Sequence, residues 1–314
     1  MAAPLRHALA LLLTAALGAP VAASPLQVEQ VAPGVYVHVG AHKDFDDGYD
    51  GDIANIGFIV GSKAVAIVDS GGAYAVGMAL KEAVRAVTPL PIRYLINTHG
   101  HPDHVFGNAA FTSGEAAPSA ARVIGHAHLP AALAARRDAY VRTLKTQLGA
   151  AEPALLVGAD QLVTERIELD LGGRSLVLTA WPAAHSSADL TVFDSASGAL
   201  WTGDLLFAER TPALDGDITG WLGAIVTLKA LAAAVTVPGH GPVLRSNGAK
   251  NQALDRQGAY LTALLRDVRS DIRAGTSMTA AMHTAAAAER GHWRLFDVVN
   301  RRNVNYLFPL LEWE

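Results

Sequence analysis

The chain has 314 residues, of which 51% are hydrophobic and 17% charged, and its formal net charge is −4. This length and composition allow a substantial core, and the lack of any basic run argues against nucleic acid as a partner. Because the sequence contains no cysteine, disulfides, thiolate metal ligands and a thiol nucleophile are excluded.

The N-terminus has the pattern of a secretory signal. Arg6 and His7 precede an apolar stretch, residues 8–17, which is followed by small residues through Ala23. We therefore predict a signal peptide over residues 1–23, and a periplasmic or secreted mature protein. The alternative is a membrane anchor, but the apolar stretch is short for a span, and no other segment predicts one. Removal of residues 1–23 takes away one arginine and no acid, so the formal charge becomes −5.

Apolar runs and turn signals predict the elements in chain order. Strands are predicted at residues 35–39, 55–60 and 64–69, then a helix after Gly71-Gly72 and a strand at 94–97. Next come a helix over 130–149, hairpins over 167–179 and 190–202, a long helix over 252–273 and a short alanine-rich helix over 279–289. No repeat or linker divides the chain. We expect residues 24–314 to form one α/β domain, with a helical segment from about residue 250 packed on it.

Six residues follow a strand-like apolar run at 92–96: His99-Gly100-His101-Pro102-Asp103-His104. Imidazole and carboxylate are the ligands that zinc and similar divalent metals prefer. In extended backbone His99 and His101 point the same way and can share one metal. Asp103 and His104 are adjacent, so they diverge and can reach a second metal. The spacing therefore predicts a metal site directly after a buried strand.

At these residues the chain resembles the metallo-β-lactamase superfamily, whose signature is His-x-His-x-Asp-His. The resemblance implies a four-layered αβ/βα sandwich, with two mixed β-sheets flanked by helices and a two-metal site at one edge. It also implies further site residues in a fixed order, each just after a strand. The chain supplies Asp69 after an apolar run, His185 in Pro-Ala-Ala-His, Asp204 in Trp-Thr-Gly-Asp and His240 in Pro-Gly-His-Gly.

Other segments resemble a narrower family, the quinoprotein relay system zinc metallohydrolases. These are secreted proteins associated with quinone-cofactor dehydrogenases and sulfur oxidation. The resemblance is carried by residues 48–57 (Gly-Tyr-Asp-Gly-Asp-Ile-Ala-Asn-Ile-Gly), residues 211–221 (Thr-Pro-Ala-Leu-Asp-Gly-Asp-Ile-Thr-Gly-Trp), Arg302-Asn303-Val304 and the terminal Leu-Glu-Trp-Glu. It implies a periplasmic quinoprotein as a partner.

The superfamily resemblance implies a metallohydrolase with two zinc ions. The first ion would be held by His99, His101 and His185, and the second by Asp103, His104 and His240. Asp204 would bridge the two ions, and Asp69 would orient a ligand imidazole or a nearby backbone group. A water shared between the metals would ionise near neutral pH and attack a carbonyl-type bond of a small molecule, with Asp103 and Asp204 as the catalytic carboxylates.

Two other functions use the same residues. One is a mononuclear iron oxygenase of sulfur compounds, with iron on His99, His185 and Asp204. The other is a non-enzymatic periplasmic partner in which the metals are structural. The residues alone do not separate these alternatives from hydrolysis.

The segment 44–52 holds five acids in nine residues, without the Glu of a calcium loop. It is either a solvated hairpin loop or a flap over the metals, in which case Phe45 and Tyr49 could touch substrate. As a flap, its carboxylates should favour neutral or cationic substrates. Trp221 either lines the pocket or lies in the core. We expect structural roles for the remaining histidines, including His126 and His128.

Overall fold

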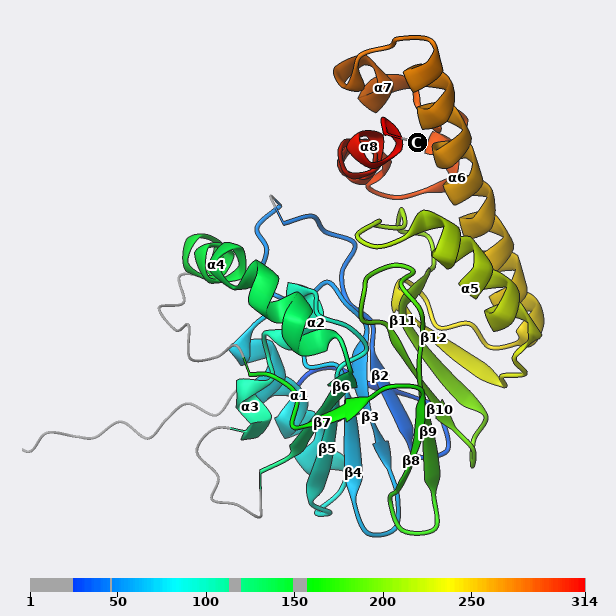
Figure 1. The fold of residues 1–314 in the computed structure, drawn as a ribbon. Coiled ribbons are helices and arrows are strands. Elements are labelled where there is room, and N and C mark those ends of the chain that lie inside the picture. Colours follow the sequence, from blue (N-terminus) through cyan, green and yellow to red (C-terminus); the bar gives the residue numbers. More distant parts are fainter. Residues whose placement is uncertain (1–24, 46, 113–119, 149–156, 314) are drawn as a thin grey trace, which may run out of the picture.

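The structure is a computed structural model that describes residues 25–45, 47–112, 120–148 and 157–313. The predicted signal peptide lies outside these residues. Two mixed sheets form the body of the molecule (Figure 1). The first has the order β1 (Glu29–Ala32), β2 (Val35–His38), β3 (Ile56–Val60), β4 (Val65–Val68), β5 (Ile92–Ile96), β6 (Arg122–His126) and β7 (Gln161–Val163). The second has the order β12 (Val235–His240), β11 (Ala199–Phe207), β10 (Leu190–Asp194), β9 (Ser175–Ala180) and β8 (Arg166–Asp170).

Helices cover the outer faces of both sheets, so the predicted αβ/βα sandwich is confirmed (Figure 1). In β4 every residue is buried, because Ala66 and Val68 face the second sheet while Val65 and Ile67 face α1. The helices are α1 (Tyr74–Val87), α2 (Pro102–Val105), α3 (Ala109–Thr112), α4 (Leu129–Leu148), α5 (Ile218–Ala230), α6 (Asn247–Arg273), α7 (Met278–Thr284), the 3₁₀ helix η2 (Ala287–His292) and α8 (Phe296–Leu311).

Helix α6 packs against α5 and the second sheet and extends beyond them, where α7 and α8 pack against it (Figure 1). The predicted helix over 279–289 is wrong as a continuous element. It is broken at Ala286, which has φ 53° and donates its N–H to the Asp267 carboxylate, and η2 follows. Helix α8 was not predicted, since Asn300 and Asn303 occupy buried positions where apolar residues were expected. Within the described residues, no helix is both long and apolar enough to cross a membrane.

Two site residues lie inside strands, although each was expected just after one. Strand β11 continues through Asp204 to Phe207, and β12 ends on His240 itself. The pairing of β11 with β12 shifts register on both sides of Gly203, where φ is +50°, so Asp204 lies in an irregular part of the ladder. The other predicted donors come from the loop after β5, from α2 and from the β9–β10 connection.

Candidate metal centre

The first donor cluster consists of His99, His101, His185 and Asp204. The Nδ1 atom of His101 lies 3.0 Å from Nε2 of His99 and 2.9 Å from Nε2 of His185. The Asp204 Oδ2 atom lies 3.5 Å from the His185 nitrogen and 3.8 Å from that of His99. Four donors bound at about 2.0 Å around a tetrahedral ion are separated by roughly 3.3 Å, so these spacings fit one metal ion.

The second donor cluster consists of Asp103, His104 and His240. The Nε2 atom of His240 lies 3.3 Å from Asp103 Oδ2, and that of His104 lies 3.7 Å from the same oxygen. Asp204 reaches this cluster as well, because its Oδ1 atom is 3.2 Å from His104 Nε2 and its Oδ2 atom is 3.4 Å from His240 Nε2. One carboxylate therefore lies between both clusters.

Two buried atoms of this centre have no hydrogen-bond partner within the described part of the chain: Nε2 of His104 and Oδ1 of Asp204. Buried polar atoms are rarely left unpaired, and each such exception calls for an explanation. The two atoms lie 3.2 Å apart, and a cation bound between them would satisfy both. The imidazole and carboxylate donor set suits zinc, so the residues fit a two-metal centre.

Burial and charge set the protonation of these donors. Burial lowers the pKa of His185 to about 4, and burial together with the charge of His104 lowers the pKa of His99 well below its ordinary value. Both rings are therefore neutral at pH 7, the form that binds a metal. Burial would raise the pKa of Asp204, but the charges of His240 and His104 hold it far below the ordinary range. The carboxylate between the clusters is thus ionised.

Asp69 orients the second cluster from the end of β4. Its carboxylate accepts hydrogen bonds from the Thr98 N–H at 2.8 Å, the Thr98 hydroxyl at 2.7 Å and Nδ1 of His104 at 2.8 Å. The donation from His104 Nδ1 leaves its Nε2 lone pair directed at the cluster. The backbone of Asp69 has φ 56°, a conformation that its N–H bond to the Ile96 carbonyl helps to hold.

The His240 turn is held by the segment 48–57. Nδ1 of His240 donates to the Ile53 carbonyl at 2.8 Å, and the Asn55 side chain donates to the carbonyls of Pro238 and Gly241, both at 2.8 Å. Gly239 is required at this turn, since a Cβ there would come within 1.8 Å of an Asp204 carboxylate oxygen. Asn55 was not predicted as a site residue, although it lies inside a motif that the sequence analysis singled out.

The first cluster is oriented by the segment 211–217. Nε2 of His101 donates to the Asp215 carboxylate at 2.7 Å, and Arg136 of α4 forms an ion pair with that carboxylate. Nδ1 of His185 donates to the Ala213 carbonyl at 2.7 Å. Asp215 was also missed, although it too lies inside a quoted motif. Trp221 is fully buried behind His185, with ring centroids 5.2 Å apart, so it belongs to the core.

The acidic segment is only partly solvated. Asp44 is buried and accepts two hydrogen bonds from Arg302 of α8, at 2.6 and 2.8 Å. Asp52 accepts a hydrogen bond from His38 at 2.7 Å. The Tyr49 ring is buried, with its hydroxyl 3.5 Å from the Gly72 carbonyl, and Asp46 lies outside the described residues. The paired carboxylates Asp44 and Asp52 therefore hold the segment in place.

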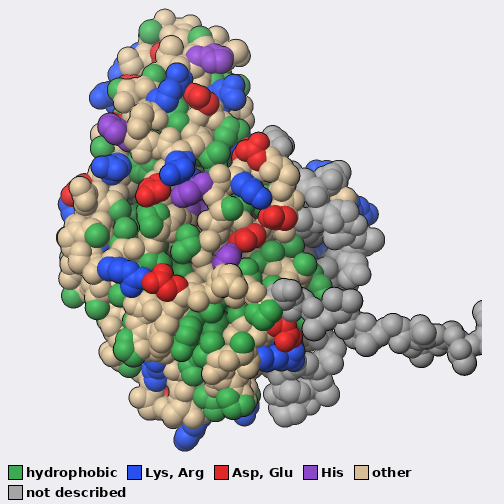
Figure 2. Space-filling model, turned by 180° about the vertical axis from the view of Figure 1, so that it is seen from behind, with side chains coloured by type: hydrophobic (Ala, Val, Ile, Leu, Met, Phe, Trp, Pro, Cys, Tyr) green, Lys and Arg blue, Asp and Glu red, His purple; other side chains and the backbone are tan. Residues whose placement is uncertain are grey.

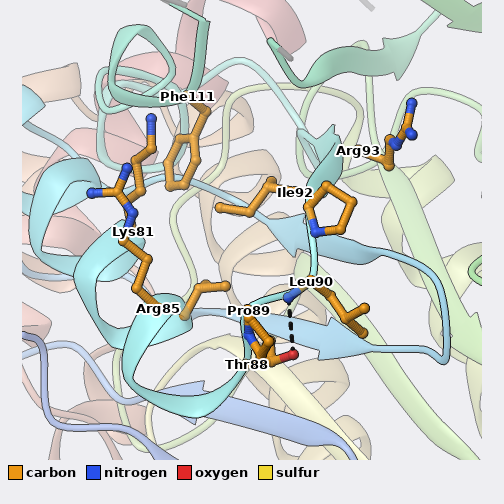
Figure 3. Close-up of a pocket in the computed structure, with 10 residues that line it drawn as sticks. Lys81, Arg85, Thr88, Pro89, Leu90, Ile92, Arg93 and Phe111 are labelled. Atoms are coloured by element: carbon orange, nitrogen blue, oxygen red, sulfur yellow. Dashed lines mark hydrogen bonds between the residues drawn. The ribbon is translucent and has the colours of Figure 1, made fainter. Parts of the chain in front are cut away.

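Two other features lie apart from the donor clusters. His126 accepts a hydrogen bond at Nδ1 from the His128 N–H, 2.9 Å away, and neither residue belongs to the clusters. A cavity of about 490 Å³ opens between α1 and the N-terminal end of β5, lined by Lys81, Arg85 and Phe111 among others (Figure 3). The donors follow the opposite end of β5, so this cavity is not part of the metal centre.

Comparisons with known proteins agree with this geometry. The family model described as the metallo-beta-lactamase superfamily matches residues 49–240. No curated protein matches the chain. Among solved structures, an inverting sec-alkylsulfatase from Pseudomonas sp. has 14% identity and a TM-score of 0.71, covering 91% of this chain and 50% of its own. The chain thus spans half the length of that enzyme.

Two further solved structures are similar over most of their own length. A beta-lactamase domain protein from Burkholderia ambifaria has 17% identity and a TM-score of 0.63, and the match covers 94% of this chain and 90% of that protein. A metallo-beta-lactamase from Pontibacter korlensis has 18% identity and a TM-score of 0.57, covering 76% and 99%.

Proposed function

The chain belongs to the metallo-β-lactamase superfamily, and from this premise we propose that it is a di-zinc hydrolase that cleaves a carbonyl-type bond of a small molecule. A lactam, a lactone and a thioester are the substrate classes that suit it. The observation that best supports two metals is the sharing of Asp204, whose Oδ1 faces His104 and whose Oδ2 faces His185. Paired catalytic metals lie roughly 3.5–4 Å apart, a distance that one carboxylate can bridge.

Zinc ions at such a centre supply a nucleophile from water and polarise a carbonyl oxygen. The residues of the chain hold and tune that centre. Asp103 and Asp204 are the catalytic carboxylates in this proposal. Burial would raise the pKa of Asp103, but the charges of His104 and His240 hold it below its ordinary value, so its oxygens accept hydrogen bonds and do not donate them. Asp204 balances positive charge and fixes the spacing of the two clusters.

The second cluster argues against the iron oxygenase. Mononuclear iron would use His99, His185 and Asp204 and would leave Asp103, His104 and His240 without a ligand role. These three side chains are buried, converge within 4.8 Å and are oriented by Asp69 and Ile53. Burial of three converging polar groups is costly unless something satisfies them.

The proposal also includes the location of the protein and a partner protein. We infer secretion to the periplasm from residues 1–23, and a quinoprotein partner from the motifs at 48–57, 211–221 and 302–304. Those motifs also have roles in orienting the donors, so they support the partner less strongly than the metal centre. The fold does not choose the substrate, since the similar structures include both a sulfatase and a β-lactamase.

Metal content and hydrolysis test the proposal together. Protein loaded with excess zinc and then desalted should retain two zinc ions per chain, and should hydrolyse at least one class in a panel of lactams, lactones and thioesters. One iron and no zinc in protein from native cells would support the oxygenase. Two zinc ions without turnover on the whole panel would support a structural role. The N-terminus of periplasmic material should lie near Ser24, and a cytoplasmic protein that keeps Met1 would contradict secretion.

A further inference from the structure

A cavity lies among the C-terminal helices, apart from the donor clusters. Its volume is about 320 Å³, and its walls come from α7, η2 and the first turns of α8. Neither a metal donor nor a residue that orients a donor lines it. Figure 2 shows basic side chains and histidines on the upper part of the face that it draws, which the C-terminal helices form. The cavity is therefore separate from the metal centre.

Arg290 is restrained at one side of this cavity. Its guanidinium carbon lies 5.6 Å from the centroid of the Phe296 ring, and its Nε atom lies 3.1 Å from Oδ1 of Asp297. The ring and the carboxylate hold the guanidinium from two directions. Because the ion pair uses Nε, the two terminal nitrogens of Arg290 keep N–H groups for another acceptor.

Arg301 and His283 line the same cavity without partners. Both residues are exposed. Within the described part of the chain, Arg301 forms no ion pair, whereas the next residue, Arg302, is paired with Asp44. Among the same residues, the His283 ring has no hydrogen-bond partner. Its ring nitrogens are therefore available to a ligand.

The charges around the cavity leave a positive surplus. Of the described residues that line it, Asp297 is the one carboxylate, and Arg290 already engages it. Arg301 therefore adds a positive charge that no carboxylate of the cavity balances. A concave site with a few polar groups and an uncompensated charge is typical of a ligand-binding pocket. The charge favours an anion as the ligand.

We propose that this cavity binds a tetrahedral oxyanion, a sulfate or a phosphate group, between Arg290, Arg301 and His283. Guanidinium groups suit such anions because they present several N–H donors in a fixed plane. The three side chains come from η2, α8 and α7, so donors from three elements surround one space. That arrangement suits a tetrahedral anion better than a planar carboxylate. The inference does not depend on the proposed hydrolase, since none of these residues belongs to the donor clusters.

Calorimetry on the zinc-loaded full chain tests the site. Sodium sulfate and sodium phosphate are titrated into wild type and Arg301→Gln, and an anion that binds at zinc contributes equally to both. The substitution should weaken at least one of the two anions roughly 10-fold or more, the cost of losing hydrogen bonds to a charged group. Arg301 is exposed and unpaired, so zinc content and the free energy of unfolding should stay unchanged. Unchanged affinity for both anions would overturn the site, and acetate binding as tight as sulfate binding would overturn the tetrahedral assignment.

Arg273→Gln is the matched control. Arg273 lies in the last turn of α6, is exposed and has no ion pair among the described residues, but it does not line the cavity. Its loss should change either affinity by less than about twofold, because exposed charges at a distance are screened. Equal weakening by both substitutions would show a diffuse charge effect and would contradict a site.

Residue-resolved protection locates the anion. Phenylglyoxal modifies arginine side chains, and mass spectrometry of peptides measures the rate at each one. Sulfate or phosphate should slow the modification of Arg290 and Arg301 several fold relative to chloride at equal ionic strength, without affecting Arg273. Stronger protection by vesicles of phosphatidylcholine with phosphatidic acid than by free phosphate would assign a lipid headgroup, and protection by the free ions alone would assign a soluble anion. Equal protection of all three arginines, or of none, would overturn the proposal.

Discussion

The two donor clusters are oriented by different parts of the chain. The second cluster depends on the first sheet and its loops, through Asp69 and the Ile53 carbonyl. The first cluster depends on the segment 211–217, through Ala213 and Asp215. That segment is in turn held by α8, where Asn303 accepts a hydrogen bond from the Leu214 N–H and donates to the Pro212 carbonyl.

This difference links the C-terminal helices to the metal centre. Residues 49–240 carry all seven donors and match the family model, whereas Asn303 lies outside that range. Tyr306 of α8 also donates to the Gly216 carbonyl, 3.1 Å away. Helix α8 should therefore affect the affinity of the first cluster for metal and leave the second nearly unchanged. Competition with a chelator resolves two zinc affinities, and His185→Ala and His240→Ala assign them to the first and second clusters.

The largest effect is expected from Asp204→Asn, because both clusters share this carboxylate. The amide keeps the shape and removes the charge, so both zinc affinities should fall, each by roughly 10- to 100-fold. Asp194→Asn serves as the control, since Asp194 is buried in an ion pair with Arg174 and belongs to neither cluster. If Asp204→Asn lowers the zinc affinity of only one cluster, Asp204 is not shared by both.

Asp215→Asn should separate the clusters. The change weakens the acceptor of the His101 Nε2 proton, so the first zinc affinity should fall by about tenfold while the second stays within twofold. Asp217→Asn is the matched control two residues away, because Asp217 caps α5 by accepting a bond from the Thr219 N–H. Equal losses at both sites in Asp215→Asn would show that the clusters are not independently oriented.

Asn303→Ala should also weaken zinc binding at the first cluster, but less than Asp215→Asn does, because Asn303 acts from α8 through the segment 211–217. Loss of its buried hydrogen bonds should lower the free energy of unfolding by about 1–3 kcal/mol and weaken the first zinc affinity by a few fold. Asn300→Ala, one turn earlier, loses bonds to Tyr260 and the Ala285 carbonyl and should destabilise similarly without changing either zinc affinity. Urea unfolding and chelator competition measure the two effects. If both variants lose zinc affinity equally, stability alone explains the loss.

The smallest effect concerns His38 and Asp52, next to Ile53 on the side of the second cluster. Burial opposes protonation of His38, but the hydrogen bonds to Asp52 and the Gln27 carbonyl, together with the charge of Asp52, outweigh it, so the pKa of His38 is raised. The pair therefore stabilises the fold fully below the unfolded pKa of about 6.5, and this contribution is lost as pH rises through the higher folded pKa. Between pH 6 and pH 9, the free energy of unfolding measured in urea should fall by up to about 1 kcal/mol more for wild type than for Asp52→Asn. If the free energy of unfolding depends on pH identically in both proteins, the His38–Asp52 pair does not contribute to stability as proposed.

The sequence predicted the metal donors better than the residues that orient them. The reason is the separation along the chain between each donor and the residue that orients it. His99 to His104 form a six-residue segment that begins three positions after the end of β5, so their convergence is a local property. Asp215 and Asn55 stood in quoted motifs, but their partners lie 114 and more than 180 residues away, and only the packing of the two sheets brings them together.

The same limit applies to the elements. Strands with continuous apolar runs, such as β3 and β4, were predicted within one residue at either end. Helix α8 was not, because its buried face carries Asn300 and Asn303, which bind distant loops and the neighbouring helix. Polar residues that are satisfied by tertiary contacts hide the helical period of a segment.

Anomalous diffraction at the zinc edge, on crystals of the zinc-loaded protein, tests the central claim most directly. We predict two anomalous peaks on opposite sides of the Asp204 carboxylate. One should contact His99, His101 and His185, and the other Asp103, His104 and His240. A single peak, or a second peak away from Asp103, His104 and His240, would contradict a two-metal centre built on a shared carboxylate.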